Sequence, residues 1–189
     1  MLVFELARHD KRVVGINLVA PEDDPISLRD YTLHMRMLQY LSTLYPEVKI
    51  ALHAGELTLG LVPPNELRFH IRQAVEIGKA SRIGHGVDIM EEDDALDLLN
   101  EMAQQRVLVE INLTSKRSDT WSSRNAHPLM TYLKAGVPMA LSTDDEGVSR
   151  IDLTHQYQRA VEEHHLMYTD LKTMARNSLE YSLLPGPSY

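Results

Sequence analysis

The alternation of short apolar runs with longer amphipathic stretches limits the folds open to this chain of 189 residues. The apolar runs have the length of buried strands, and the amphipathic stretches place apolar residues at helical spacing. Strands are expected at residues 12–19, 48–53, 81–84, 107–112 and 137–142. Helices are expected at residues 28–45, 66–78, 92–105, 126–135, 153–165 and 170–181. This order predicts an α/β fold of right-handed βαβ units around a parallel sheet.

The number of strands leaves the architecture open. A closed (β/α)8 barrel needs eight strands and about 250 residues, whereas a doubly wound sheet of five strands fits a chain of this length. We find no internal repeat and no linker rich in Gly, Ser or Pro. We therefore expect residues 1–189 to form a single domain.

Charge and composition exclude several classes of function. The formal net charge is -8, and an acidic surface repels phosphate backbones and anionic lipids. We therefore expect no nucleic acid and no membrane partner, and a small neutral or weakly charged substrate fits better. The chain has no cysteine, which excludes disulfides, thiolate nucleophiles and cysteine-bound zinc. No apolar run is long enough to cross a membrane, so we expect a soluble protein. The first residues lack a basic leader, so we expect no targeting segment in this chain, and the compartment stays unknown.

Polar residues follow three of the expected strands closely. They are His53, Glu56, His85, Asp144 and Asp145. Because the carboxyl ends of parallel strands lie at one edge of a sheet, we expect these side chains to converge. Each has a structural explanation when it is taken singly, such as an aspartate that caps a helix. Five ionisable residues in equivalent positions together favour a metal site or an acid/base site.

The residue types suggest zinc chemistry. Imidazole and carboxylate ligands without thiolate suit Zn²⁺ with one position left open for water, whose pKa the metal lowers to about 7. Glu56 lies three residues beyond His53 and can donate a proton during nucleophilic attack. His85 can orient or deprotonate the attacking water, and Asp144 can bind the metal.

Three segments in this order resemble signature blocks of the adenosine deaminase family. They read HAGE at residues 53–56, RIGHG at residues 82–86 and STDD at residues 142–145. Residues 15–23 are similar to the preceding block, most closely that of the growth-factor-related branch. The resemblance extends from about Val13 to Leu184 and corresponds to the C-terminal part of such a protein.

The resemblance implies a metal-dependent (β/α)8 barrel of the TIM type, of which this chain holds about the last five β/α units. It implies zinc-dependent hydrolysis of adenosine, or a close purine nucleoside, to inosine and ammonia. His53 and Asp144 would be ligands of one Zn²⁺ per complete site. Glu56 would protonate the purine ring, His85 would position the attacking water, and Asp145 would hydrogen-bond the purine.

The sequence also departs from the family pattern. The family's His-x-His pair supplies two further zinc ligands, but no two histidines here are separated by one residue. A missing N-terminal segment or a partner chain would then complete the barrel, and we expect this chain alone to be inactive. Ala20 stands where a purine-contacting glycine is usual, and we expect Ala20 and Gly55 to contact the substrate. A deaminase of another 6-aminopurine and a non-catalytic module derived from this family remain alternatives.

Overall fold

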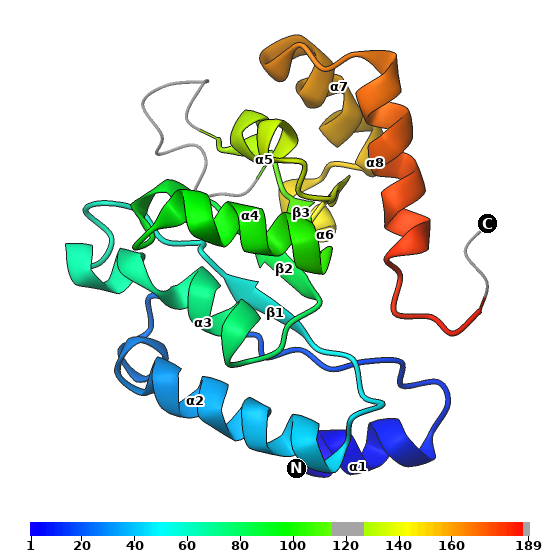
Figure 1. Cartoon of the computed structure of the whole chain (residues 1–189). Helices are drawn as coiled ribbons and strands as arrows, with labels where there is room; N and C mark the ends of the chain where they lie inside the picture. Colours follow the sequence, from blue (N-terminus) through cyan, green and yellow to red (C-terminus); the bar gives the residue numbers. More distant parts are fainter. Residues whose placement is uncertain (115–126, 187–189) are drawn as a thin grey trace.

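The computed structural model describes residues 1–114 and 127–186 and has a four-stranded parallel sheet at its centre. The strands are β1 (Ala51–Ala54), β2 (Arg82–His85), β3 (Leu108–Ile111) and β4 (Met139–Leu141). They pair in chain order, and every pair is parallel. Figure 1 shows helices in the connections between successive strands. This is the βαβ arrangement that the sequence predicts.

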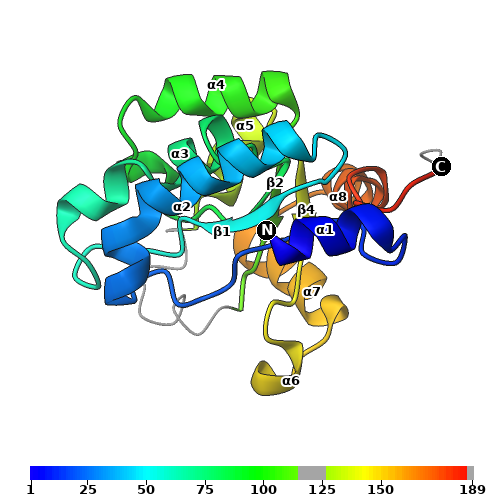
Figure 2. The ribbon, with the colours of Figure 1, turned by 90° about the horizontal axis from the view of Figure 1, so that it is seen from below.

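Helices cover one side of this sheet. The α-helices are α1 (Leu2–His9), α2 (Pro25–Leu44), α3 (His70–Glu76), α4 (Ala95–Gln105), α5 (Leu129–Ala135), α6 (Glu146–Ser149), α7 (Leu153–His164) and α8 (Tyr168–Glu180). The 3₁₀ helices are η1 (Pro64–Arg68) and η2 (Ile89–Glu91). Figures 1 and 2 show α2, α3, α4 and α5 on the same side of the sheet. Helix α8 packs against β4 at the other end of the sheet from β1.

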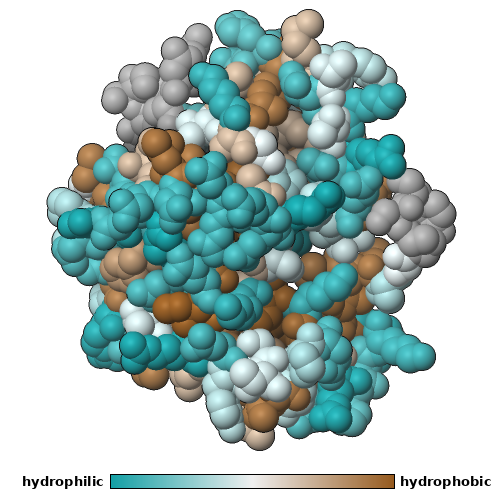
Figure 3. Space-filling view, viewed as in Figure 1, coloured by the Kyte–Doolittle hydropathy of each residue, from teal (hydrophilic) through white to brown (hydrophobic). Residues whose placement is uncertain are grey.

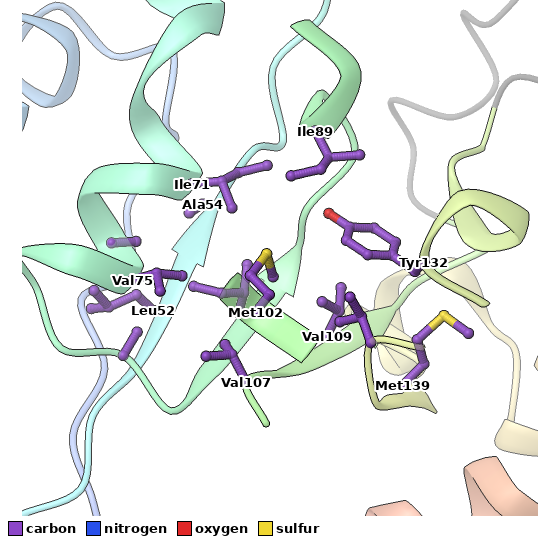
Figure 4. Close-up of a cluster of buried hydrophobic side chains, with 14 of the residues drawn as sticks. Leu52, Ala54, Ile71, Val75, Ile89, Met102, Val107, Val109, Tyr132 and Met139 are labelled. Carbon is purple, nitrogen blue, oxygen red and sulfur yellow. The ribbon is translucent and has the colours of Figure 1, made fainter. Parts of the chain in front are cut away.

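A hydrophobic core fills the space between the sheet and this layer of helices (Figure 4). Leu52 and Val109 enter it from the strands, and Ile71, Met102 and Tyr132 enter it from α3, α4 and α5. All five side chains are at most 1% exposed. Burial of an aliphatic side chain of this size stabilises a fold by about 1.5–3 kcal/mol. The outer surface of α4 is mainly hydrophilic (Figure 3), as expected for an amphipathic helix.

Local sequence signals explain where α2 begins and ends. Asp24 caps the helix, because its carboxylate accepts the Ile26 N–H at 2.8 Å, and Pro25 occupies the first helical position. The helix ends at Leu44, shortly before Pro46. The segment before this cap lies beside the carboxyl end of β1, because Asn17 contacts His53 and Glu22 contacts Gly55.

The prediction of a strand at residues 12–19 is wrong. The segment makes only an isolated parallel bridge between Ile16 and Ile50. The Ile16 N–H donates to Lys49 O and the Ala51 N–H donates to Ile16 O, both at 2.9 Å. Only Ile16 is buried in this segment, and its last three residues are exposed. The β-branched run therefore lacks the burial that would extend its ladder with the start of β1, and the sheet of the described residues has four strands instead of five.

Several helix boundaries also differ from the expected ones. The helix expected at residues 66–78 is divided into η1 and α3 at Phe69, whose φ of -151° and ψ of -6° are not helical. Helix α4 begins at Ala95, after η2, instead of at residue 92. Helix α5 begins at Leu129, and residue 126, the expected start, lies outside the described residues. Helix α1 and the four-residue α6 were not expected from the sequence, and α6 is too short to show helical periodicity.

The longest helix, α2, has charged and polar residues along its length. Within the described ranges, the molecule has no helix with the length and apolar character needed to cross a membrane.

Candidate active site

The parallel strands bring two histidines and an aspartate together. His53 lies in β1, His85 is the last residue of β2, and Asp144 follows β4. Each residue offers one ligand atom, and the three atoms lie within 4.8 Å of one another. The two imidazole ring centroids are 4.9 Å apart. Two nitrogens and one carboxylate oxygen at this separation are a donor set that can hold a divalent metal such as zinc.

The backbone at the strand ends is unusual. His85 has φ of +74° and Asp144 has φ of +51°, which is the left-handed region that L-residues seldom occupy. Such residues cost about 1–3 kcal/mol each and are maintained where the surrounding structure holds them in place. After β2 the holding contact is visible, because the buried Tyr132 hydroxyl donates to Gly86 O at 2.5 Å. A Cβ on Gly86 would lie 2.5 Å from that hydroxyl, so only glycine fits.

The electrostatic environment favours a cation between these side chains. Burial, together with the charge of His85, lowers the pKa of His53 and favours the neutral imidazole that binds metals. Burial and the charges of Asp145 and Glu56 raise the pKa of Asp144. A divalent cation would offset this crowding of negative charge.

Two amides and one carboxylate surround the imidazoles. Asn17 Nδ2 donates to His53 Nδ1 at 3.4 Å, and the buried Asn112 donates to His85 Nδ1 at 3.2 Å. Glu56 Oε1 lies 3.7 Å from His85 Nδ1. Such neighbours restrict the orientation of the rings. The geometry therefore puts an acid beside a histidine at the edge of the possible metal site.

The remaining predicted site residues have different surroundings. Asp145 is exposed at the start of α6 and acts on Asp144 through its charge. Ala20 lines a cavity of about 240 Å³ that also reaches His53. Gly55 is buried, its N–H is bonded to Glu22, and its carbonyl accepts the Val87 N–H at 2.7 Å. The contacts of Ala20 and Gly55 with substrate stay predictions.

Two buried residues near this edge of the sheet were not expected from the sequence. Glu22 and His70 form a pair with 2.7 Å between Oε1 and Nδ1, and neither is more than 5% exposed. Glu22 lies within the segment that resembles a family block, but the sequence contained no indication of its partner. His70 is the first residue of α3, and its position in a helical pattern resembles that of any core residue.

Comparison with known proteins establishes the family. A family model described as adenosine deaminase matches residues 2–188. The chain belongs to the adenosine deaminase family. An adenosine deaminase of Salmonella dublin is 38% identical over 136 residues, which are 71% of this chain and 38% of the Salmonella protein. Membership of the growth-factor-related branch stays a prediction.

Solved structures identify the fold. The N6-methyl-AMP deaminase of Arabidopsis thaliana is similar with a TM-score of 0.69 and 29% identity, over 95% of this chain and 48% of the plant protein. An amidohydrolase of Burkholderia ambifaria, with bound zinc, gives a TM-score of 0.70 at 18% identity, over 97% of this chain and 48% of that protein. The open parallel sheet is therefore part of a (β/α)8 barrel, and the chain spans about half the length of these structures.

Proposed function

We propose that this chain is part of a zinc-dependent aminohydrolase that converts adenosine, or a close purine nucleoside, to inosine and ammonia. The observation that carries the proposal is the cluster of His53, His85 and Asp144, whose ligand atoms lie within 4.8 Å of one another at the carboxyl ends of parallel strands. The named activity of the Salmonella relative supports deamination.

The donor set fits zinc. His53 and Asp144 would hold the ion, and their nitrogen and oxygen ligands match the chemistry of a catalytic zinc site without cysteine. When bound, Zn²⁺ would make hydroxide available at neutral pH. Since the His-x-His pair of the family has no counterpart here, we propose that a further polypeptide segment supplies the other ligands.

The proposed reaction adds water at the carbon that carries the 6-amino group and releases that group as ammonia. Glu56 would hand its proton to the adjacent ring nitrogen as the carbon is attacked. His85, 3.7 Å from the Glu56 carboxylate, would orient the attacking water, take its proton and pass it to the amino group as that group leaves as ammonia. The proton of the hydroxyl added to the carbon would return to the Glu56 carboxylate and leave the carbonyl of the product. Asp145 would hydrogen-bond the imidazole side of the purine, where Ala20 and Gly55 would complete the binding site.

A second candidate is the deamination of a different 6-aminopurine. Ala20 replaces the glycine expected to contact the purine, and the Arabidopsis neighbour is named for a methylated nucleotide. The cavity beside Ala20 and His53 is the place where such substrates would be distinguished.

Zinc titration of the full chain by calorimetry tests the metal site. We expect the unaltered chain to bind zinc measurably. His53→Ala and Asp144→Ala should each weaken the affinity for zinc by about tenfold or more, whereas His85→Ala should keep it. His9→Ala, which removes an exposed histidine of α1, is the matched control. Loss of binding in His85→Ala as well would make His85 a ligand. The absence of zinc binding both in the unaltered chain and in the chain mixed with an N-terminal segment of a related deaminase would refute the proposal.

Substrate turnover is tested separately by the change in ultraviolet absorbance. Adenosine, adenine and AMP are supplied to the zinc-loaded chain and to the chain mixed with an N-terminal segment of a related deaminase. We expect no turnover by the chain alone and conversion of one purine after complementation. Turnover by the chain alone would contradict the proposal that further ligands are required. Zinc binding without turnover of any purine in the mixture would favour a non-catalytic module.

A further inference from the structure

The turn that carries Glu56 is fixed by a buried carboxylate from another part of the chain. The Gly55 N–H donates to Glu22 Oε1 at 2.9 Å, and the Glu56 N–H donates to Glu22 Oε2 at 2.7 Å. Glu22 is 5% exposed. One carboxylate therefore binds two consecutive backbone N–H groups directly after β1.

Glu22 is itself held by His70. His70 Nδ1 lies 2.7 Å from Glu22 Oε1, and the His70 side chain is fully buried. Its ring stacks on Tyr31 with centroids 3.8 Å apart and 13° between the planes. The Tyr31 hydroxyl donates to His70 O at 2.9 Å. Helices α2 and α3 thus fix the histidine, and the histidine fixes the carboxylate.

The charge state of Glu22 suits this contact. Burial opposes ionisation, but the hydrogen bond and charge of His70 and the two backbone N–H donors outweigh it, so the pKa of Glu22 is lowered. An ionised carboxylate makes stronger hydrogen bonds to N–H groups than a neutral acid does. The opposite side of the turn is bonded as well, because Gly55 O accepts the Val87 N–H at 2.7 Å.

Burying such a pair is costly, and apolar residues would fill the same space with less desolvation. Both carboxylate oxygens of Glu22 are directed at the backbone of Gly55 and Glu56. The Glu56 side chain leaves that backbone toward His85, to which it comes within 3.7 Å.

We propose that Glu22, held by His70, is a positioning residue that fixes the backbone of Gly55 and Glu56 and so directs the Glu56 carboxylate toward His85. The value of this contact for catalysis rests on the proposed function. The contact itself does not require metal, substrate or turnover, so it is tested on the chain without them.

Backbone amide hydrogen exchange and side-chain couplings of Glu56, both measured by NMR on the labelled full chain, test the proposal. In Glu22→Gln the side-chain oxygen can accept one N–H, but the new amide nitrogen cannot accept the other. We expect exchange at Gly55 or Glu56 to become about tenfold faster or more, and the Glu56 side chain to average over rotamers. Glu22→Asp has a shorter side chain but keeps the charge, so it should change the exchange and the Glu56 couplings less than Glu22→Gln does. It replaces Glu22→Gln in the test if that variant does not fold.

Glu92 provides a matched control. It is also a buried carboxylate, and it accepts two consecutive N–H groups, from Ile71 at 2.6 Å and Arg72 at 3.2 Å. Both N–H groups donate to the same oxygen, Glu92 Oε1, and the amide oxygen of Glu92→Gln can keep both bonds. Glu92→Gln should therefore leave exchange at Ile71, Arg72 and Glu56 within about twofold of the unaltered chain. Unchanged exchange and couplings of Glu56 in both Glu22 variants would overturn the proposal, and so would an equal effect of Glu92→Gln on Glu56. Neither result depends on whether the chain binds zinc or deaminates a purine.

Discussion

Asp88 should make the stability of this protein depend on pH. It lies just beyond β2 and is 5% exposed, and neither carboxylate oxygen has a hydrogen-bond partner in the described part of the chain. Burial, with the negative charges of Glu22 and Glu92, raises the pKa of Asp88 to about 9. The folded protein therefore keeps Asp88 protonated at neutral pH, whereas in the unfolded chain its pKa is about 3.9.

The sign of the effect follows from proton binding. Between about pH 4 and pH 9 the folded state holds one more proton on Asp88 than the unfolded state does, so the free energy of unfolding falls as pH rises. The slope from this one group is about 1.4 kcal/mol per pH unit, or about 3 kcal/mol between pH 5 and pH 7. Asn has the same shape as Asp and does not titrate. Asp88→Asn should therefore remove this slope and stabilise the protein at pH 7 relative to the unaltered chain.

Urea denaturation followed by circular dichroism at pH 5, 6 and 7 measures the effect. The quantity to compare is the difference in free energy of unfolding between Asp88→Asn and the unaltered chain, which should increase with pH. The pKa of Glu92 is also raised, to about 7, but Glu92 is present in both proteins, so its own contribution is largely removed by the subtraction. Asp94→Asn, at an exposed position before α4, is the control and should give a difference independent of pH. A constant difference for Asp88→Asn would refute the reasoning.

Two further substitutions test the strand-end contacts by thermal and urea denaturation. Gly55→Ala should destabilise the protein by about 2 kcal/mol or more, because φ is +78° and the new Cβ would lie 2.6 Å from Asp88 Oδ1. Gly60→Ala is the control for backbone strain alone, because φ is +91° and the new Cβ would have no heavy atom within 4 Å. It should lower the free energy of unfolding by only about 1 kcal/mol. Equal destabilisation by Gly55→Ala and Gly60→Ala would contradict the predicted clash with Asp88. Tyr132→Phe removes the hydroxyl that donates to the Gly86 carbonyl and should lower the free energy of unfolding by about 1–3 kcal/mol. An unchanged free energy of unfolding would show that this hydrogen bond does not stabilise the fold.

Sequence patterns located the candidate site because its chemistry depends on local position. His53, His85 and Asp144 each lie at or directly after an apolar run, and parallel pairing brings such positions to the same edge of the sheet. The segment at residues 12–19 has an equally apolar run, but only Ile16 in it is buried and it makes a single bridge, to Ile50. Strand formation depends on burial against the rest of the fold as well as on the run itself.

The pairing of Glu22 with His70 could not be read from the sequence. The two residues are 48 positions apart, and their contact depends on how α3 packs beside the segment that precedes α2. No periodic pattern encodes such a distance. The burial of Asp88 likewise follows from packing, because an aspartate in a polar stretch is ordinarily exposed.

The separation between the packed layer and the edge that carries His53, His85 and Asp144 has a consequence for how this protein can change. Substitutions at the tips of the strands can alter which molecule is bound while the packing against α3, α4 and α5 continues to hold the sheet together. A mutant library that varies the half-buried or exposed Glu56, Asp144 and Asp145 and leaves Gly55 and Gly86 unchanged should therefore yield mostly folded variants with altered ligand preference. A library of the same size drawn from the packed layer should mainly change the yield of folded protein.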